Sequence, residues 1–316
     1  MTETLDYTDY VARPVTDGDR AGAAGVGERA LRVLYDGPLL PYALLRHRRL
    51  LRRCRHTDRH TYTAFLRSPS QLRLLAGPVV DFLRPGGAGD DRLEIVLLAC
   101  SNGAEAYTIA SWLHRHRPRL DFRIRASDLH PEMVARARAA RYSADEVLHG
   151  RFMTRAFLRD TFIEEGAQFV VRPEIRARVE VEQADLLDAE RLCARFGPAQ
   201  LVVAQNVLFH LPEPAAERAF AALTRLLAPR AVLMVAGMNL DLRARLTAQA
   251  GLAPFAQDVR RIHREGRAHT PPHWWRVPWG AEPYLPFRRD PVRRYATVYR
   301  AGGHDAAMPA PGEVGV

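Results

Sequence analysis

The chain has 316 residues, enough for one large domain or for a core with a smaller additional domain. Its formal net charge is +10, and all 46 residues of the Lys+Arg count are arginine. A chain without lysine cannot form a pyridoxal Schiff base or a Walker A phosphate loop. The arginine excess favours carboxylate or phosphate partners, although a GC-rich genome would produce the same bias.

Hydropathy and cysteine spacing exclude further classes of protein. No apolar run reaches the length of about 18 residues that a membrane span requires, and the N-terminal segment is too polar and acidic for a secretory signal peptide. Cys54, Cys100 and Cys193 are far apart, so neither a disulfide framework nor a metal cluster is predicted. We therefore expect a cytoplasmic protein without a metal site. Residues 1–27 and 301–316 are expected to lack order.

Residues 28–84 are predicted to form a small helical N-terminal domain. Leucine clusters separated by arginines, as in LLRHRRLLRRCRH, are typical of helices, and no alternating strand pattern appears there. The segment Arg84–Asp91, RPGGAGDD, is a predicted linker. It is rich in glycine, but it precedes the first predicted strand and so cannot be a phosphate-binding turn, which follows a strand.

Strands and helices alternate from residue 92 to residue 300. Strands are predicted over Leu93–Cys100, Phe122–Asp128, Arg178–Asp185, Leu201–Asn206, Ala231–Gly237 and Ala296–Arg300. Helices are predicted over 104–116, Pro131–Tyr142 and 215–227. This alternation indicates an α/β fold with a Rossmann-like, doubly wound, mostly parallel sheet.

The turn after the first predicted strand and the acidic end of the second are candidates for a cofactor site. Gly103, in ACSNGAEAY, lets the backbone approach a ligand, and the helix start that follows favours an anionic group. Asp128, at the end of the second strand, is placed to accept hydrogen bonds from ribose hydroxyls. These features fit NAD and S-adenosylmethionine equally well. A tight turn at Gly103 and a cap for the helix that begins near Pro131 are the alternatives without a ligand.

Five segments, in the same order, resemble the chemotaxis receptor glutamate methyltransferases, the CheR family. ACSNGAEAYTIA is similar to that family's ACSTGEEPYSIA, and TYTAFLR (Thr61–Arg67) is similar to its NLTAFFR. ASDLHPEMVARARAARYS is similar to ASDIDTEVLEKARSGIY, RPEIRARVEVEQADLLD to a segment that ends in NLL, and AQNVLFHLP to CRNVMIYFD. The resemblance covers about Leu31–Ala250. It implies a Rossmann-like methyltransferase that uses S-adenosylmethionine.

The resemblance also implies a cofactor site that draws residues from both parts of the chain. These residues would be Thr61, Thr63, Arg67, Glu105, Asp128, Asp185, Leu186, Gln205 and Asn206. Asp128 would hold the ribose, and Asp185 with Leu186 would flank the adenine. Gln205 and Asn206 would lie beneath the methionine portion of the cofactor.

Two residues are predicted to act in catalysis, Arg67 and His210. Arg67 would orient a carboxylate, because guanidinium pairs well with that group. His210 replaces the family's tyrosine near the transferred methyl, and Gln205 replaces its arginine. These departures favour a small-molecule or otherwise atypical acceptor. His210 would then act as a general base toward a hydroxyl or amine, or it lies in the turn without touching the substrate.

Three functions stay open at this point. The first is O-methylation of a small or atypical acceptor, the second is O-methylation of a protein glutamate, and the third is cofactor binding without catalysis. The joint presence of Thr63, Arg67, Glu105 and Asp128 argues against the third. The basic segment Arg46–Arg59 would suit an acidic protein partner, as the family's N-terminal domain is held to do, or it is a solvated helix face. A nucleic acid partner is not expected, because no RNA- or DNA-binding signature accompanies the segment.

Residues 252–295 depart from the family pattern as an insertion. The segment contains HTPPHWWRVPWGAEPYLPF, which is too aromatic for a disordered linker and too rich in proline for a regular helix. We expect an ordered lid over the acceptor side. Trp274, Trp275 and Trp279 would form pocket walls, or they pack against the sheet without contacting the substrate.

Overall fold

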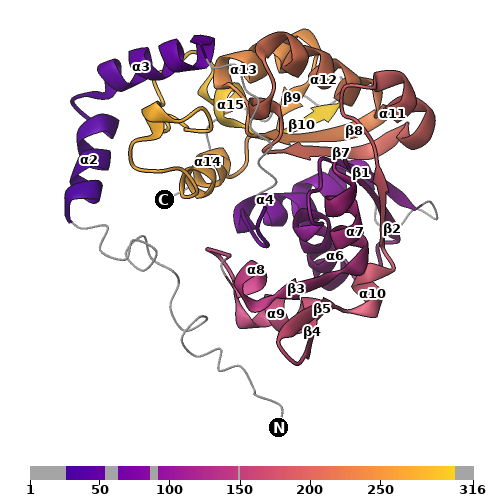
Figure 1. Cartoon of the computed structure of the whole chain (residues 1–316). Coiled ribbons are helices and arrows are strands. Elements are labelled where there is room, and N and C mark those ends of the chain that lie inside the picture. The colour runs from indigo at the N-terminus through magenta and orange to yellow at the C-terminus, as the bar shows by residue number, and fades with distance from the viewer. Residues whose placement is uncertain (1–25, 54–62, 86–91, 149, 303–316) are drawn as a thin grey trace, which may run out of the picture.

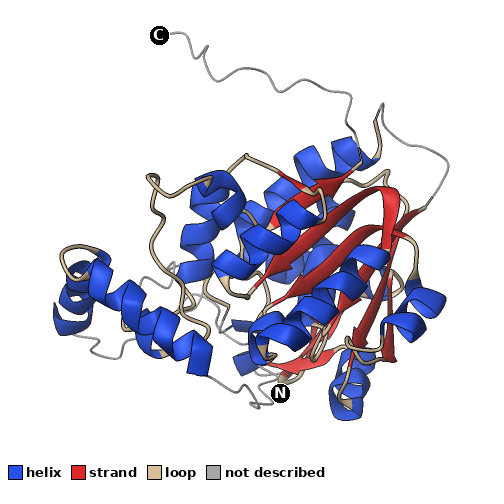
Figure 2. Ribbon diagram, turned by 90° about the horizontal axis from the view of Figure 1, so that it is seen from above, coloured by secondary structure: helices blue, strands red, loops and turns tan. Residues whose placement is uncertain are grey.

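A seven-stranded sheet forms the centre of the molecule. The computed structural model describes residues 26–53, 63–85, 92–148 and 150–302. The strands of the sheet are β1 (Leu93–Leu98), β2 (Phe122–Asp128), β6 (Val179–Gln183), β7 (Ala199–Gln205), β8 (Leu227–Ala236), β9 (Ala253–Pro254) and β10 (Val298–Ala301). They lie in the order β6-β2-β1-β7-β8-β10-β9, and helices cover both faces (Figure 2). The first five strands of this order are parallel, whereas β10 is antiparallel to both neighbours. The expected α/β fold with a doubly wound, mostly parallel sheet is confirmed.

The sheet divides the hydrophobic core into two clusters. One lies beneath α6 (Ala104–His116) and α7 (Pro131–Ala139), and the other beneath α11 (Ala189–Phe196), α12 (Glu213–Arg225) and α13 (Leu240–Gln249). Along β1, Ile95 and Leu97 belong to the first cluster and Val96 and Leu98 to the second. Successive side chains of a strand point to opposite faces, so a strand covered on both sides needs a continuous apolar sequence. This explains the run LEIVLL.

A second, three-stranded antiparallel sheet follows α7, and the sequence reasoning did not predict it. It has the order β3-β5-β4, with bounds β3 (Arg141–Ser143), β4 (Phe162–Glu165) and β5 (Gln168–Val171). The short helices α8 (Ala144–Leu148), α9 (Arg155–Thr161) and α10 (Pro173–Arg176) accompany it. The helix predicted through Tyr142 ends at Ala139, because Ala140 adopts a left-handed conformation with φ of 55°. Tyr142 then pairs with Phe169 in the small sheet.

The N-terminal helices form two separate groups. They are α2 (Val26–Asp36), α3 (Leu40–Arg53), α4 (Pro69–Leu74), the π-helical turn η1 (Leu75–Val79) and α5 (Val80–Leu83). The second group, α4 to α5, packs into the core of the sheet, whereas α2 and α3 pack against the C-terminal segment (Figure 1). The expected boundaries also shift, because Val26 and Gly27 belong to α2 and Ala301 belongs to β10. Residues 1–25, 54–62 and 303–316 lie outside the described residues.

The segment 252–295 is folded throughout. It supplies the edge strand β9 and also contains α14 (Val259–Arg267), the 3-10 turn η3 (Trp274–Arg276) and α15 (Pro291–Tyr295). The loop around η3 lies against α3, which comes from the opposite end of the chain (Figure 1). Across the described ranges, no helix is long and apolar enough to cross a membrane.

Candidate active site

The carboxyl ends of β1, β2, β6 and β7 meet at one edge of the sheet, where doubly wound folds bind their ligands. After β1 the backbone turns sharply, with φ of 59° at Ala99, 51° at Ser101 and 89° at Gly103. The buried carboxylate of Asp128 accepts hydrogen bonds from the backbone N–H of Ser101 (2.7 Å) and of His130 (3.0 Å). The residue expected to hold a ribose therefore also fixes the turn beside it.

Gly103 is required by the close packing of this turn. A Cβ at this position would lie 3.0 Å from Cβ of Ala137 and 3.1 Å from Cε2 of Tyr107, and the φ of 89° disfavours side chains with a Cβ. The glycine lets α6 start directly at the turn and pack against α7. The N-terminus of α6 consequently points at the ligand edge of the sheet.

A half-buried carboxylate, Glu105, follows in the first turn of α6. Gln205, at the end of β7, donates a hydrogen bond of 2.6 Å from Nε2 to Oε1 of Glu105. Burial raises the pKa of Glu105 to about 7, although the charge of Arg67 and the hydrogen bond from Gln205 act in the opposite direction. A cation beside this carboxylate would compensate its loss of hydration. The site therefore fits a ligand with an ammonium or sulfonium group, and S-adenosylmethionine carries both.

Asn206 stands where β7 meets the adjacent end of β8. Its φ is 57°, and its backbone N–H donates to the carbonyl of Ala236 over 3.0 Å. Gly237, with φ of 65°, passes so close that a Cβ there would lie 2.4 Å from Cα of Asn206. Only glycine permits this approach, which brings the two backbone segments at Asn206 and Gly237 together.

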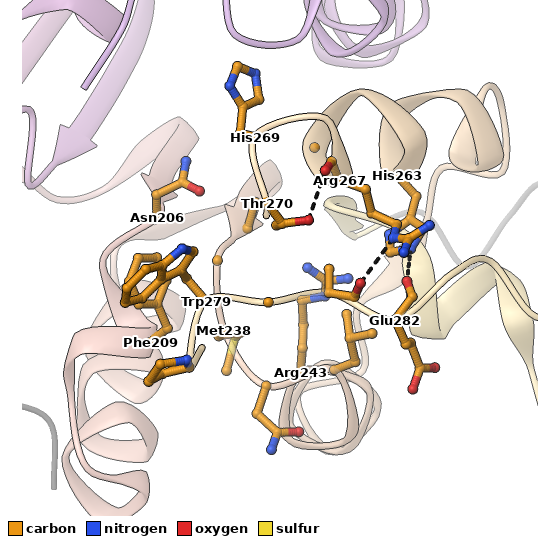
Figure 3. A pocket seen from close by; sticks show the side chains of 18 of the residues that line it. Asn206, Phe209, Met238, Arg243, His263, Arg267, His269, Thr270, Trp279 and Glu282 are labelled. Carbon is orange, nitrogen blue, oxygen red and sulfur yellow. Dashed lines mark hydrogen bonds between the residues drawn. The ribbon is translucent and has the colours of Figure 1, made fainter. Parts of the chain in front are cut away.

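Two adjoining cavities lie beside Asn206. The smaller has a volume of about 90 Å³ and is lined by Glu105, Thr108 and Gln205 among others, and the larger has about 570 Å³. Both are lined by Arg67, Asn206, Ala236, Ile262, Gly266, His269 and Thr297. The larger cavity extends from the ends of β7 and β8 to the segment 252–295 (Figure 3). Residues of α3 also line it. Its volume is in the range of small-molecule sites, about 300–1,000 Å³.

The structure brings only part of the predicted site together. Arg67, Asn206 and His210 line the large cavity, and Arg67, Glu105, Gln205 and Asn206 line the small one. Thr63, Asp128, Asp185 and Leu186 line neither of these two cavities. Thr61 lies outside the described residues.

The residues expected to flank the adenine follow β6, the terminal strand of the sheet next to β2. Asp185 is exposed in the turn after β6, and its Oδ1 accepts a hydrogen bond of 2.8 Å from the backbone N–H of Leu187. Leu186 is half-buried beside it. Because β6 is next to β2, both lie near Asp128 in the order of the strands.

The three tryptophans of the segment 252–295 have different positions. Trp279 lines the large cavity, as expected. Trp274 and Trp275 are buried against α2 and α3 and do not line it, so the expectation for these two as walls was wrong. The ring of Trp275 stacks on Tyr35 with centroids 3.6 Å apart. These aromatic residues join the segment 252–295 to α2 and α3, which offer an apolar surface there.

No sequence pattern indicated the residue that anchors the segment 252–295 to α2. Asp36, at the end of α2, accepts hydrogen bonds from Nη2 of Arg267 at 2.8 and 2.9 Å and from Nε1 of Trp274 at 3.0 Å. Single charged residues at helix ends are common, and only the fold brings this one to partners more than 230 residues away. Within the described part of the chain, no group of three His, Cys, Asp or Glu side chains is arranged to hold a metal.

The fold and this edge define a Rossmann-like protein that is built to bind a nucleoside-type cofactor. Residues 61–247, more than half of the chain, match the family model described as "CheR methyltransferase, SAM binding domain". The chain therefore belongs to the CheR methyltransferase family, and its cofactor is S-adenosylmethionine.

Curated relatives match the same region. One, described as an uncharacterized 104.1 kDa protein of Rhodobacter capsulatus, is 30% identical over 50% of this chain and 16% of its own length. Another, a chemotaxis protein methyltransferase of Listeria innocua, is 27% identical over 55% of this chain and 63% of its own length. The chain thus spans less than two thirds of either relative. Among solved structures, magnesium protoporphyrin IX methyltransferase of Synechocystis is 16% identical over 74% of this chain and 90% of that one, with a TM-score of 0.33.

Proposed function

We propose that this chain transfers a methyl group from S-adenosylmethionine to an oxygen atom of a small molecule held in the large cavity. The observation that carries the proposal is the continuity of the two cavities at Arg67 and Asn206. Bound S-adenosylmethionine would supply a methyl group on a sulfonium sulfur; the acceptor oxygen takes the methyl, the carbon–sulfur bond breaks, and S-adenosylhomocysteine leaves. An enclosed acceptor beside the donor site gives the alignment and exclusion of water on which such a displacement depends.

On this proposal, residues at the sheet edge hold the cofactor. Asp128 would accept hydrogen bonds from the ribose, and Asp185 with Leu186 would flank the adenine. Glu105 would face the cationic methionine portion, because its half-buried carboxylate needs a positive charge nearby. Asn206 would lie where the cofactor and acceptor meet.

His210 is the proposed general base. It lies in the 3-10 turn η2 (Leu208–His210) and lines the large cavity, with its ring centroid 4.1 Å from that of Phe209. A neutral imidazole would take the proton of an acceptor hydroxyl as the carbon–oxygen bond forms. Arg67, which lines both cavities, would orient the acceptor.

A protein carboxylate is the second candidate acceptor. It is favoured by the similarity to the chemotaxis protein methyltransferase of Listeria innocua and by Arg48 of α3, which lines the cavity. A carboxylate needs no general base, so His210 would then have no proton to accept.

Two measurements test this proposal. Calorimetry is expected to give micromolar binding of S-adenosylhomocysteine, and the absence of binding would contradict the cofactor site. Incubation of cell extract with the full chain and heavy-methyl S-adenosylmethionine, followed by mass spectrometry, is expected to label a metabolite. Label found only in protein would instead support the second candidate.

A further inference from the structure

The wall of the large cavity contains a buried guanidinium without a carboxylate beside it. Arg243, on α13, is only 2% exposed. Its Nη2 donates a hydrogen bond of 2.9 Å to the carbonyl oxygen of Arg294, whereas its buried Nε has no acceptor among the described residues. Among these described residues, no ion pair within 4.0 Å includes Arg243. Figure 3 shows its side chain rising from α13 in the cavity wall.

The nearby carboxylates already pair with other arginines. Glu282 Oε1 accepts a hydrogen bond of 2.7 Å from Nε of Arg294, and Asp241 contacts Nη1 of the same guanidinium. Arg267 is paired with Asp36 on the other side of the lid. Among the described residues, the guanidinium of Arg243 therefore has no ion-pair partner.

The histidine in the same wall, His263, adds no charge to this end of the cavity. His263 lies in the same wall, and its Nε2 is 2.8 Å from the carbonyl oxygen of Glu282, to which it donates when that nitrogen is protonated. Burial lowers the pKa of His263 to about 3. The imidazole is neutral near pH 7, so the charge at this end of the cavity comes from the guanidinium groups.

An isolated buried charge is costly unless an opposite charge accompanies it. We infer that Arg243 forms a subsite for a compact anionic group, a carboxylate or phosphate, that is carried by the small acceptor. This inference rests on the proposed function. Asn206 and His210 line the same cavity near the donor edge, so the acceptor would bring its reacting oxygen to them and its anionic group to Arg243. Methylation of that oxygen leaves the second group charged, and the product remains an anion.

The first test measures anion binding with matched variants. Arg243→Gln removes the charge from the wall, and Arg245→Gln removes one from the same helix outside the cavity, where Arg245 pairs with Glu213 and Glu217. The full chain, loaded with S-adenosylhomocysteine, is titrated with inorganic phosphate and separately with glutarate at constant ionic strength, and the melting temperature is followed.

Saturable stabilisation by phosphate or glutarate is expected for the wild-type chain and for Arg245→Gln. The apparent affinity is expected to fall by about 10-fold to 100-fold in Arg243→Gln, the usual effect of losing hydrogen bonds to a charged group. No saturable effect in the wild-type chain, or equal affinities in Arg243→Gln and Arg245→Gln, would overturn the subsite. If Arg243→Gln does not fold, Arg243→Lys replaces it: the lysine keeps the charge but lacks the planar fork, so weaker binding is expected and wild-type affinity overturns the inference.

The second test determines the charge of the product. The heavy-methyl metabolite from cell extract is applied to an anion exchanger. It is expected to bind the column through its own carboxylate or phosphate group, and mass spectrometry distinguishes these two groups. A neutral or cationic methylated product would contradict the subsite. If the chain neither binds S-adenosylhomocysteine nor labels any product, the proposed function is wrong, and the titration of the ligand-free chain with phosphate and glutarate still decides the subsite.

Discussion

Glu105 is expected to couple cofactor binding to proton release. With its pKa raised to about 7 by burial, this carboxylate is half protonated in the free protein near pH 7, and a cationic ligand favours its ionised form. The affinity for S-adenosylmethionine should therefore rise by roughly tenfold between pH 6 and pH 8. Calorimetry in buffers of different ionisation enthalpy measures both quantities. Glu105→Gln should bind with an affinity that no longer changes over this range, and an unchanged pH dependence in that variant would assign the effect to another group.

His210 is expected to affect turnover and not cofactor binding. If it is the base, His210→Ala should reduce kcat on the true acceptor by about 10²–10⁴ while the affinity for S-adenosylhomocysteine stays the same. The measurement is steady-state turnover with the acceptor found by labelling, together with calorimetry. A variant with wild-type turnover would reduce His210 to a part of the cavity wall.

At the scale of the elements, the contact between α2 and the segment 252–295 is expected to contribute much of the stability of this part of the molecule. Asp36→Asn removes the charge that faces Arg267, whose side chain is only 13% exposed. Leaving this guanidinium without a carboxylate should lower the free energy of unfolding by about 2–4 kcal/mol. Urea titration of the full chain measures the loss. Asp81→Asn is the control, because the Asp81 carboxylate is largely exposed beside Arg117 and should matter little. Equal effects of the two substitutions would contradict a special role for Asp36.

The strands were predictable where the sheet is covered on both faces. The apolar runs at β1, β7 and β8 predicted buried strands because a strand that is covered on both faces carries a continuous apolar sequence. The small sheet was missed because its strands are three or four residues long and half-exposed. The helix that was predicted to continue through Tyr142 ends earlier because pairing with β5 outweighs the local helical pattern.

The candidate site was predictable only in part. Asp128 was predicted from its position at the end of a recognisable strand, whereas Gln205 was predicted only from the resemblance to the CheR family. Arg243 and Asp36 could not be found, because one is an arginine among many and the other ends an ordinary helix. Their importance arises from tertiary contacts with the segment 252–295, which no local pattern reports.

At the scale of the whole molecule, buried histidine predicts a loss of stability in mild acid. The pKa of His263 is lowered by burial to about 3, so below its ordinary value of 6.5 the unfolded chain takes up a proton that the folded chain does not. The contribution of His263 to the free energy of unfolding is fully present above pH 6.5 and decreases as the pH falls toward 3. At pH 5 it has decreased by about 2 kcal/mol.

Comparison of His263→Asn with the wild-type chain isolates this contribution. The difference in unfolding free energy between the two, measured in urea, should shrink by that amount from pH 7.5 to pH 5. His116→Asn serves as the control because His116 is exposed. A difference independent of pH would show that His263 is accessible to protons in the folded state.

The ion pair of Asp36 with Arg267 joins residues 231 positions apart, and this separation sets an order of assembly during synthesis. The strand ends that form the cofactor edge have all been synthesised once Asn206 has been added. The acceptor cavity still lacks α13, α14 and the loop around η3 at that moment, so α2 and α3 have no surface to pack against until the segment 252–295 is made. The nascent protein would thus have the cofactor edge of the sheet before the large cavity for the acceptor is complete.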